Sequence, residues 1–166
     1  MKKLVILLLL LVASTGFGAM IEAESLELRL KGGMDFDNSK GEVETSVDIG
    51  LGYFIFDDIE VGGLISFGFT ESDAGFGLGG FSEFLFDLNC SVAPYVGIAL
   101  QYKFGDYYSD HFLLLDLSGG LKFFITDSLA ISTELFYDLA SEDIYINNEE
   151  AADDDSGIRI GLSYYF

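Results

Sequence analysis

The chain has 166 residues, a formal net charge of −20 and a mean hydropathy of +0.37. So large an excess of acidic side chains argues against nucleic acid as a partner, because phosphates repel it. Half of the residues are nevertheless hydrophobic and 15% are aromatic, so charged and apolar side chains must occupy separate surfaces of one domain.

The first 19 residues have the plan of a secretory signal peptide. Lys2 and Lys3 give a basic start, residues 4–12 form an apolar run, and small residues follow. The run is too short to span a bilayer as a helix. We therefore expect export and cleavage near residue 19, which leaves residues 20–166 as the mature domain. Cys90 is the only cysteine, so no internal disulfide is available, and we interpret it as a structural thiol.

Eight segments of the mature chain alternate apolar with small or polar residues, which is the period of a β-strand with one apolar face. No charged residue falls on the apolar face, and every Lys and Arg except Lys40 lies on the other. A lipid-facing sheet needs this exclusion, because a charge at the bilayer midplane costs roughly 2–4 kcal/mol. Tyr and Phe, Phe54 among them, gather at segment ends, where interfacial girdles would lie. The segments are 26–36, 43–53, 59–69, 76–86, 96–104, 113–123, 129–139 and 157–166.

The connections between these segments alternate in length. Three are tight, at 57–58, 87–90 and 126–128, and the others are longer and acidic, at 37–41, 71–75, 105–111 and 140–155. Tight turns at one end and long loops at the other are the plan of an outer-membrane barrel, with the turns in the periplasm. Residues 56–61 are echoed by residues 126–131, and each copy marks a tight hairpin.

The last ten residues, GIRIGLSYYF, form a strand with an uncharged apolar face that ends on an aromatic residue. They resemble the C-terminal signal of bacterial outer-membrane β-barrels, which the insertion machinery reads. The residues that carry this resemblance are Ile158, Ile160, Leu162, Tyr164 and Phe166.

With the stretches GLGYFIFDDIEVGG, PYVGIAL and GGLKFFITDSLAISTELFY, the resemblance extends over nearly the whole mature chain. The chain resembles the small outer-membrane β-barrel family that includes OmpX and the OmpA membrane domain. The resemblance implies an all-β fold, an eight-stranded antiparallel up-and-down transmembrane barrel with both termini in the periplasm. We interpret the chain as a monomer in the bacterial outer membrane, whose partners are membrane lipid, the barrel insertion machinery and periplasmic chaperones. The resemblance implies no single activity.

The interior of an eight-stranded barrel is just wide enough to be filled by side chains. Charged residues on the polar face of the segments would point into it, either as a gated ion path or as a paired network of charges sealed from water. We favour the network, because the many glycines on that face indicate a narrow barrel. The predicted lumen residues are Glu27, Arg29, Asp48, Glu60, Glu83, Lys103, Asp116, Lys122, Glu134 and Arg159.

Two other features could carry chemistry. His111 beside Asp110 could serve an outer-membrane enzyme, but no His-x-Ser is present and a protease of this kind needs a larger barrel. The last loop offers oxygen ligands suited to Ca²⁺ or Mg²⁺, but its spacing matches no EF-hand loop. We interpret both as solvated loop positions, and we expect no catalytic, cofactor or metal site. The loop acids are Glu142, Asp143, Glu149, Glu150, Asp153, Asp154 and Asp155.

The function predicted from the sequence is that of an integral outer-membrane barrel with a structural or surface-interaction role. Three alternatives are a narrow channel, an enzyme on the same barrel, and a secreted soluble barrel of the lipocalin type. The lipocalin alternative requires the apolar face to turn inward. The lack of Trp and the glycine-rich opposite face argue against it.

Overall fold

The computed structural model describes residues 23–37, 42–69, 74–88, 90–105, 111–142, 145–147 and 150–166. The predicted signal peptide lies outside these ranges, and so does Lys40. In the part of the chain described, no helix is long and apolar enough to cross a membrane.

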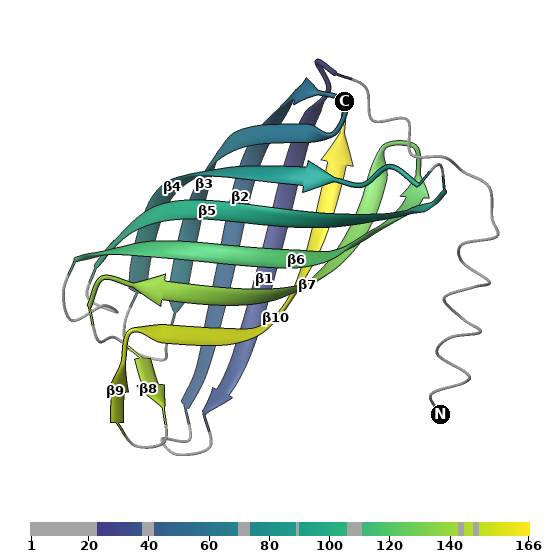
Figure 1. The fold of residues 1–166 in the computed structure, drawn as a ribbon. Helices are drawn as coiled ribbons and strands as arrows, with labels where there is room; N and C mark the ends of the chain where they lie inside the picture. Colours follow the sequence, from purple (N-terminus) through teal and green to yellow (C-terminus); the bar gives the residue numbers. More distant parts are fainter. Residues whose placement is uncertain are drawn as a thin grey trace, which may run out of the picture.

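Antiparallel strands close into a single barrel (Figure 1). Neighbours in sequence are neighbours in the wall, and the last strand closes against the first, which confirms the predicted eight-stranded antiparallel fold. The barrel strands are β1 (Leu26–Asp37), β2 (Glu42–Phe56), β3 (Ile59–Phe69), β4 (Ala74–Leu85), β5 (Val92–Gly105), β6 (Phe112–Thr126), β7 (Leu129–Ala140) and β10 (Asp154–Tyr165).

The connection from β7 to β10 contains structure that the sequence analysis did not predict. β8 (Tyr145–Asn147) and β9 (Glu150–Ala152) pair as a separate short hairpin within the expected loop 140–155. β10 also begins at residue 154, before the predicted 157, because its pairing with β7 continues beyond the apolar alternation to Asp154–Leu139.

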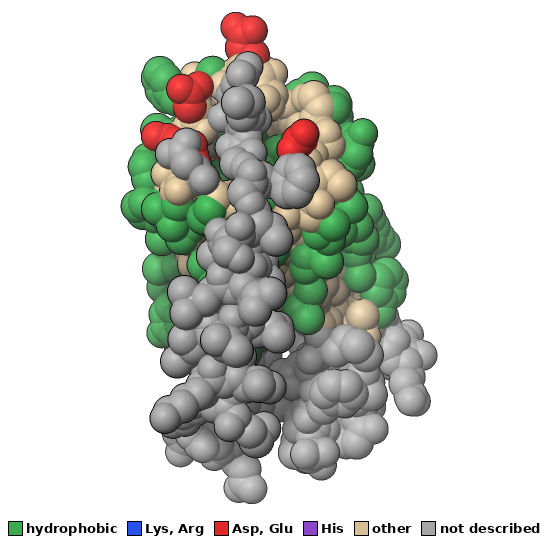
Figure 2. Space-filling view, turned by 90° about the vertical axis from the view of Figure 1, so that its right-hand side faces the viewer, with side chains coloured by type: hydrophobic (Ala, Val, Ile, Leu, Met, Phe, Trp, Pro, Cys, Tyr) green, Lys and Arg blue, Asp and Glu red, His purple; other side chains and the backbone are tan. Residues whose placement is uncertain are grey.

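Alternation along each strand separates the outer wall from the lumen. On β1, Leu28 and Leu30 are 48% and 47% exposed, whereas Glu27 and Arg29 are 0% and 4% exposed. The apolar face therefore turns outward, as Figure 2 shows for the described part of one side of the wall. This orientation is the reverse of the one that the soluble lipocalin alternative requires.

Glycines on the inward face make room for large side chains from neighbouring strands. A β-carbon at Gly62 would overlap the ring of Phe81, which lies opposite it on β4. A β-carbon at Gly52 would likewise overlap the carboxylate of Glu60. Large side chains of neighbouring strands therefore occupy the space in front of these glycines, which have no side chain of their own.

One end of the barrel, which we call the turn end, carries the tight connections. The first barrel strand begins there and the last one ends there. Two-residue turns join β2 to β3 and β6 to β7, and in each hairpin the register shifts just before the turn, which matches the echo between residues 56–61 and 126–131. The third connection, residues 86–91, is longer than the predicted 87–90. Leu26 N–H donates to the Phe166 carbonyl at 2.9 Å, and Phe166 N–H donates back to the Leu26 carbonyl at 3.0 Å.

Apolar side chains fill the lumen at the turn end. Phe54, which we expected in an interfacial girdle, is instead fully buried there, because it shares the inward face of Gly50 and Gly52. A smaller apolar cluster of Phe112, Leu114 and Ala140 lies at the opposite end, which we call the loop end. The members of the turn-end cluster are Phe54, Leu85, Ala93, Tyr95, Phe124, Ala130 and Tyr165.

The barrel wall is incompletely joined between its first and last strands. The register pairs of β1 with β10 number six and end at Gly32–Ile160, whereas every other neighbouring pair of barrel strands has eleven or twelve. Figure 1 shows β1 and β10 diverging towards the loop end. We call this gap, between residues 33–37 of β1 and residues 154–159 of β10, the open seam.

Candidate functional site

The lumen holds two groups of charged side chains at different depths. The turn-side cluster consists of Glu27, Arg29, Glu60, Glu83 and Lys122, and all five are buried. They reach the lumen from β1, β3, β4 and β6 because each lies on the inward face of its strand. Charges removed from water in this way must be paired or they destabilise the fold.

Arg29 binds three carboxylates of the turn-side cluster. One Nη donates to Glu83, the other donates to Glu60 Oε2 at 2.6 Å, and Nε lies 3.5 Å from Glu27 Oε1. Its guanidinium also lies 3.6 Å from the centre of the Phe81 ring, which is cation–π geometry. The stem of Arg29 passes over Gly50, where a β-carbon would lie 2.7 Å from its Cγ. Arg29 is therefore held by its packing as well as by its charge.

Lys122 is the second cation of this cluster, and its side chain has no exposed surface. Its Nζ lies 2.7 Å from Glu27 Oε2 and 3.0 Å from Glu83 Oε2. Its strand neighbours on β5 and β7 are the small residues Ala93 and Ser132, which leave space for the long side chain. Arg29 and Lys122 thus bind the three acids of this cluster from within it, in a buried space.

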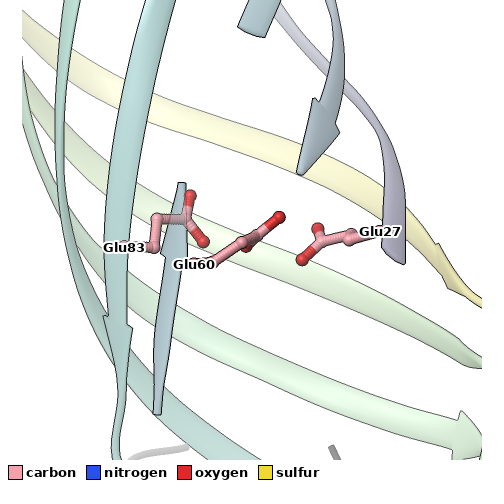
Figure 3. A group of neighbouring side chains, drawn as sticks. All are labelled: Glu27, Glu60 and Glu83. Carbon is pink, nitrogen blue, oxygen red and sulfur yellow. The ribbon is translucent and has the colours of Figure 1, made fainter. Parts of the chain in front are cut away.

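Glu27, Glu60 and Glu83 point toward one another from three strands (Figure 3). A carboxylate oxygen from each lies within 4.8 Å of the others, which is a geometry that could hold a hard cation. Arg29 and Lys122 already bond to these carboxylates, so a metal ion would have to displace a buried guanidinium or ammonium. The donor set therefore fits internal pairing better than metal binding.

Three residues with polar contacts in the lumen lie outside the predicted set. Lys31 and Tyr95 connect its two depths, and Asp138 belongs to the loop side. Lys31 Nζ lies 3.0 Å from Glu83 Oε1 and 2.7 Å from Glu134 Oε2, and the Tyr95 hydroxyl donates to the same Glu134 oxygen at 2.5 Å. Lys31 and Asp138 lie on the inward faces of their strands, so the alternation could have identified both. Tyr95 has no charge to distinguish it from the aromatic residues of the wall.

The loop-side cluster consists of Asp116, Asp138 and Arg159. Arg159 donates one Nη to Asp116 and the other to Asp138 Oδ2 at 2.7 Å, and its guanidinium lies 3.7 Å from the centre of the Phe136 ring. Phe136 in turn lies over Gly157, where a β-carbon would meet its ring. This cluster has the same plan as the turn-side one, with an arginine stacked on an aromatic ring and bound to acids.

Of the ten predicted lumen residues, eight form ion pairs, and Asp48 and Lys103 have other surroundings. Lys103 Nζ donates to Ser66 Oγ at 2.7 Å. Asp48 lines a cavity of about 30 Å³ together with Lys31 and Arg159. Such a volume has room for a water molecule or two. The eight in ion pairs are Glu27, Arg29, Glu60, Glu83, Asp116, Lys122, Glu134 and Arg159.

His111, the last loop and the C-terminal residues were the other candidates from the sequence. His111 is exposed, and its ring centre lies 6.2 Å from that of Tyr102. In the last loop, Asp154 accepts a hydrogen bond from the Tyr137 hydroxyl at 3.1 Å, while Asp143 and Glu149 lie outside the described residues. The predicted signal residues all face outward and are 44–66% exposed: Ile158, Ile160, Leu162, Tyr164 and Phe166.

Solved structures share this architecture at low sequence identity. The N-terminal β-barrel domain of Pseudomonas aeruginosa OprF aligns with a TM-score of 0.60 at 15% identity, over 87% of this chain and 98% of that one. Neisserial surface protein A aligns with a TM-score of 0.58 at 17% identity, over 86% and 95%. The outer membrane protein OprG from Pseudomonas aeruginosa aligns with a TM-score of 0.58 at 12% identity, over 90% and 99%.

No family model and no curated protein matches the sequence. Identities of 12–17% establish a shared fold and nothing finer. The resemblance to small outer-membrane barrels that the sequence predicts is thus confirmed at the level of the fold.

Proposed function

We propose that this chain is an integral β-barrel protein of the bacterial outer membrane, with a structural or surface-interaction role. The observation that carries the proposal is the outer wall, to which all eight barrel strands contribute exposed large hydrophobic side chains. A soluble monomer rarely exposes so continuous an apolar surface. A lipid bilayer would cover it, and the closed barrel pairs its backbone groups within the wall outside the open seam.

Aromatic side chains support this placement, because they gather at both ends of the wall. At the turn end the rings of Phe84 and Phe86 lie 4.9 Å apart and those of Tyr164 and Phe166 lie 6.0 Å apart. At the loop end Phe67, Phe76 and Phe104 form a chain of ring contacts across three strands. Two aromatic belts separated by aliphatic side chains fit the two interfaces of a bilayer.

Membrane fractionation combined with gel mobility tests the proposal directly. The mature chain should sediment with outer membranes, and unheated protein in detergent should migrate differently from boiled protein because the closed barrel resists unfolding. Ile98→Arg on the outer wall should reduce both signals, since a charge at the midplane costs roughly 2–4 kcal/mol. The control is Lys40→Leu, at a position that the sequence predicts to lie in a loop. Recovery of the folded parent chain in the soluble fraction without detergent would refute membrane integration.

We propose further that the chain is exported by its N-terminal segment and delivered by periplasmic chaperones to the insertion machinery, which reads the C-terminal strand. Deleting Phe166 removes one outward side chain and the two backbone hydrogen bonds with Leu26, and it leaves the other strands intact. The purified deletion variant should still fold in lipid or detergent with a modest loss of stability, and in cells it should be degraded or remain in the periplasm. Assembly at the parent's level in cells would contradict the signal role. Failure of the purified deletion variant to fold in vitro would mean that Phe166 is required for folding itself, so the two roles could not be separated.

The proposed orientation places the turn end in the periplasm and the loops outside. Protease added to intact cells should therefore cut within residues 140–155. The matched site is the turn at Asp57 and Asp58, which should be cut only after the outer membrane is permeabilised. The reverse order of cleavage would overturn the orientation.

The lumen favours a structural role over a channel or an enzyme. Eleven ion-pair contacts and the turn-end apolar cluster fill the interior of the described barrel. We therefore expect no stepwise conductance in planar bilayers. Regular single-channel steps from the monomeric chain would support the channel alternative instead. An enzyme would depend on His111, so His111→Ala should leave any hydrolase activity in the preparation unchanged.

A further inference from the structure

The ion pairs of the lumen join into one network that has more acids than cations. Lys31 links the turn-side cluster to Glu134, because its Nζ contacts both Glu83 and Glu134. Arg159 Nη1 lies 3.7 Å from Glu134 Oε1, which connects the loop-side cluster to the same network. Four cations therefore face six acids among the described residues, and two negative charges have no cation to match them. The cations are Arg29, Lys31, Lys122 and Arg159, and the acids are Glu27, Glu60, Glu83, Asp116, Glu134 and Asp138.

Lys103, the remaining cation described in the lumen, does not remove this excess. Its Nζ donates to Ser66 Oγ, and the acid that attracts it most strongly is Asp48, so this pair adds one charge of each sign. All members of the network except Arg159 are at most 9% exposed. A charge without a partner strongly destabilises such surroundings, and a buried carboxylate takes up a proton instead.

Two carboxyl oxygens mark the places where such protons fit. Glu60 Oε1 and Asp138 Oδ1 are buried and have no hydrogen-bond partner. Arg29 Nη2 and Lys122 Nζ approach Glu60 most closely at its other oxygen, Oε2, at 2.6 and 3.8 Å. Arg159 likewise binds Asp138 at Oδ2, at 2.7 Å. The cations thus occupy one oxygen of each carboxyl group and leave the other oxygen without a donor.

Glu60 and Asp138 each contact a second carboxyl group. The side chain of Glu60 is within hydrogen-bonding reach of Glu27, and that of Asp138 is within reach of Asp116. Two ionised carboxylates cannot form a hydrogen bond, because both only accept. Like charges this close do not both ionise, so such a pair holds one proton. The two carboxyl pairs therefore match the two excess acids in number.

The remaining groups around the two pairs leave no cation free to replace the protons, because each cation already binds another group. The titratable groups that face Glu60 are Glu27, Arg29, Glu83, Lys122 and Tyr165. Those that face Asp138 are Lys103, Asp116, Asp155 and Arg159.

We propose that the lumen binds two protons at neutral pH, one shared by Glu60 with Glu27 and the other shared by Asp138 with Asp116. A proton suits each pair, because one oxygen donates the hydrogen bond and the other accepts it. A hard metal ion needs about six oxygen ligands. Each pair offers a single oxygen without a partner. The proposal goes beyond the membrane role and concerns the charge state of the barrel interior.

Bound protons predict that the barrel loses stability as the pH rises. In the unfolded chain, carboxyl groups ionise at about pH 4, so above about pH 5 the folded state holds two more protons than the unfolded state. Stability falls with rising pH wherever the folded state binds more protons. The unfolding constant should therefore increase about hundredfold per pH unit while both protons are retained. This dependence should end where the folded barrel releases them.

The first experiment counts the protons on the parent chain, folded in a nonionic detergent with folding verified by gel mobility. Urea unfolding at neutral pH, in weakly buffered solution with an indicator dye, should release two protons per chain. The infrared spectrum of the folded chain should contain the C=O stretching band of protonated carboxyl groups, which ionised carboxylates lack. Release of fewer than two protons, or absence of the band, would overturn the proposal.

Two amide variants locate the protons. Glu60→Gln and Asp138→Asn replace the donating oxygen with an NH₂ group of similar size that still donates to the partner carboxylate. Each variant should release one proton fewer, and the double variant should lose the pH dependence between about pH 6 and 8. The control is Asp127→Asn in the exposed β6–β7 turn, which should change neither the count nor the pH dependence.

Full proton release from the double variant would overturn the assignment to these pairs. If an amide variant does not fold, the count on the parent chain decides.

A bound metal cation is the other means of neutralising the two acids. After treatment with a chelator, urea midpoints of the parent chain are compared in sodium, potassium, magnesium and calcium chloride at equal ionic strength. The proposal expects equal midpoints in the four salts at each pH. A midpoint that depends on the cation, without the expected dependence on pH, would assign the neutralising charge to a metal ion and overturn the proposal. Because the chain is folded in this assay, the membrane role is left to the fractionation experiment.

Discussion

The turn-side and loop-side clusters have the same plan but different enclosure. Lys122 has no exposed side-chain surface, its cluster lies beneath an apolar cap, and the wall around it is fully paired. The side chain of Arg159 keeps 11% of its surface exposed, and the wall beside it is open. Charges of the same kind are thus sealed at one depth and partly accessible at the other. We infer that the turn-side half provides stability, whereas the loop-side half can adapt to contacts from outside.

Removing a cation from the sealed half should have the largest effect. Lys122→Met keeps most of the side-chain length but leaves Glu27 and Glu83 without one of their partners, which should cost about 3–5 kcal/mol in the free energy of unfolding. Urea unfolding of the variant and the parent in lipid or detergent measures this loss of stability.

The double variant Lys122→Met with Glu83→Gln is the control for this prediction, since it removes one of the stranded charges. It should recover part of the loss. A Lys122→Met midpoint equal to that of the parent would show that the turn-side cluster does not depend on this pairing.

The same kind of change in the loop-side half should cost less. Arg159→Leu strands Asp116 and Asp138, but partial access to water lowers the penalty to about 1–3 kcal/mol. Lys40→Leu, at a position that the sequence predicts to lie in a loop, should leave the midpoint unchanged. Equal urea midpoints for both variants and the parent would refute the hypothesis that the lumen network stabilises the barrel. A larger loss of stability for Arg159→Leu than for Lys122→Met would show that the loop-side half contributes more stability than the turn-side half.

The smallest effect is expected where the two halves meet. Tyr95→Phe removes the hydroxyl that donates to Glu134, while Lys31 still binds the same oxygen. The loss should be about 1 kcal/mol, the usual net contribution of one hydrogen bond. In a thermodynamic cycle with Lys31→Met, the two changes should be non-additive because they share one acceptor. Strict additivity would mean that Tyr95 and Lys31 act independently.

Much of this molecule could be predicted from the sequence, because a barrel wall has two faces in opposite environments and the chain must alternate to satisfy both. Alternation predicted the strands and the inward placement of residues such as Arg29 and Lys122. The short connections predicted tight turns at 57–58 and 126–128, and the second turn spans residues 127–128 in the structure. Alternation applied equally to Lys31 and Asp138, which the predicted set omitted although they lie on the same inward face.

Other features depend on distances across the lumen, which alternation does not encode. Lys31 meets Glu134 from a strand that is not its neighbour, so the contact follows from the diameter of the barrel and the stagger of its strands. Phe54 looked like a girdle residue because its type suits an interface, but its position on the inward face buries it. The open seam lies between β1 and β10, the two neighbouring strands that are farthest apart in sequence. No local sequence pattern determines where their pairing ends.

The pair of hydrogen bonds between Leu26 and Phe166 can form only after the last strand of the barrel has reached the first. Closure of the barrel wall therefore waits for the last strand. Each hairpin of the wall can form as soon as its two strands exist, but the sheet keeps two edges open along their whole length until its last strand meets its first. The entropy of closing so long a loop grows only slowly with its length, so the greater danger during the wait is edge-to-edge association between unfinished copies. A chain that stalls or is truncated before its last strand would remain an open sheet, and in a cell proteases would distinguish it from the finished barrel.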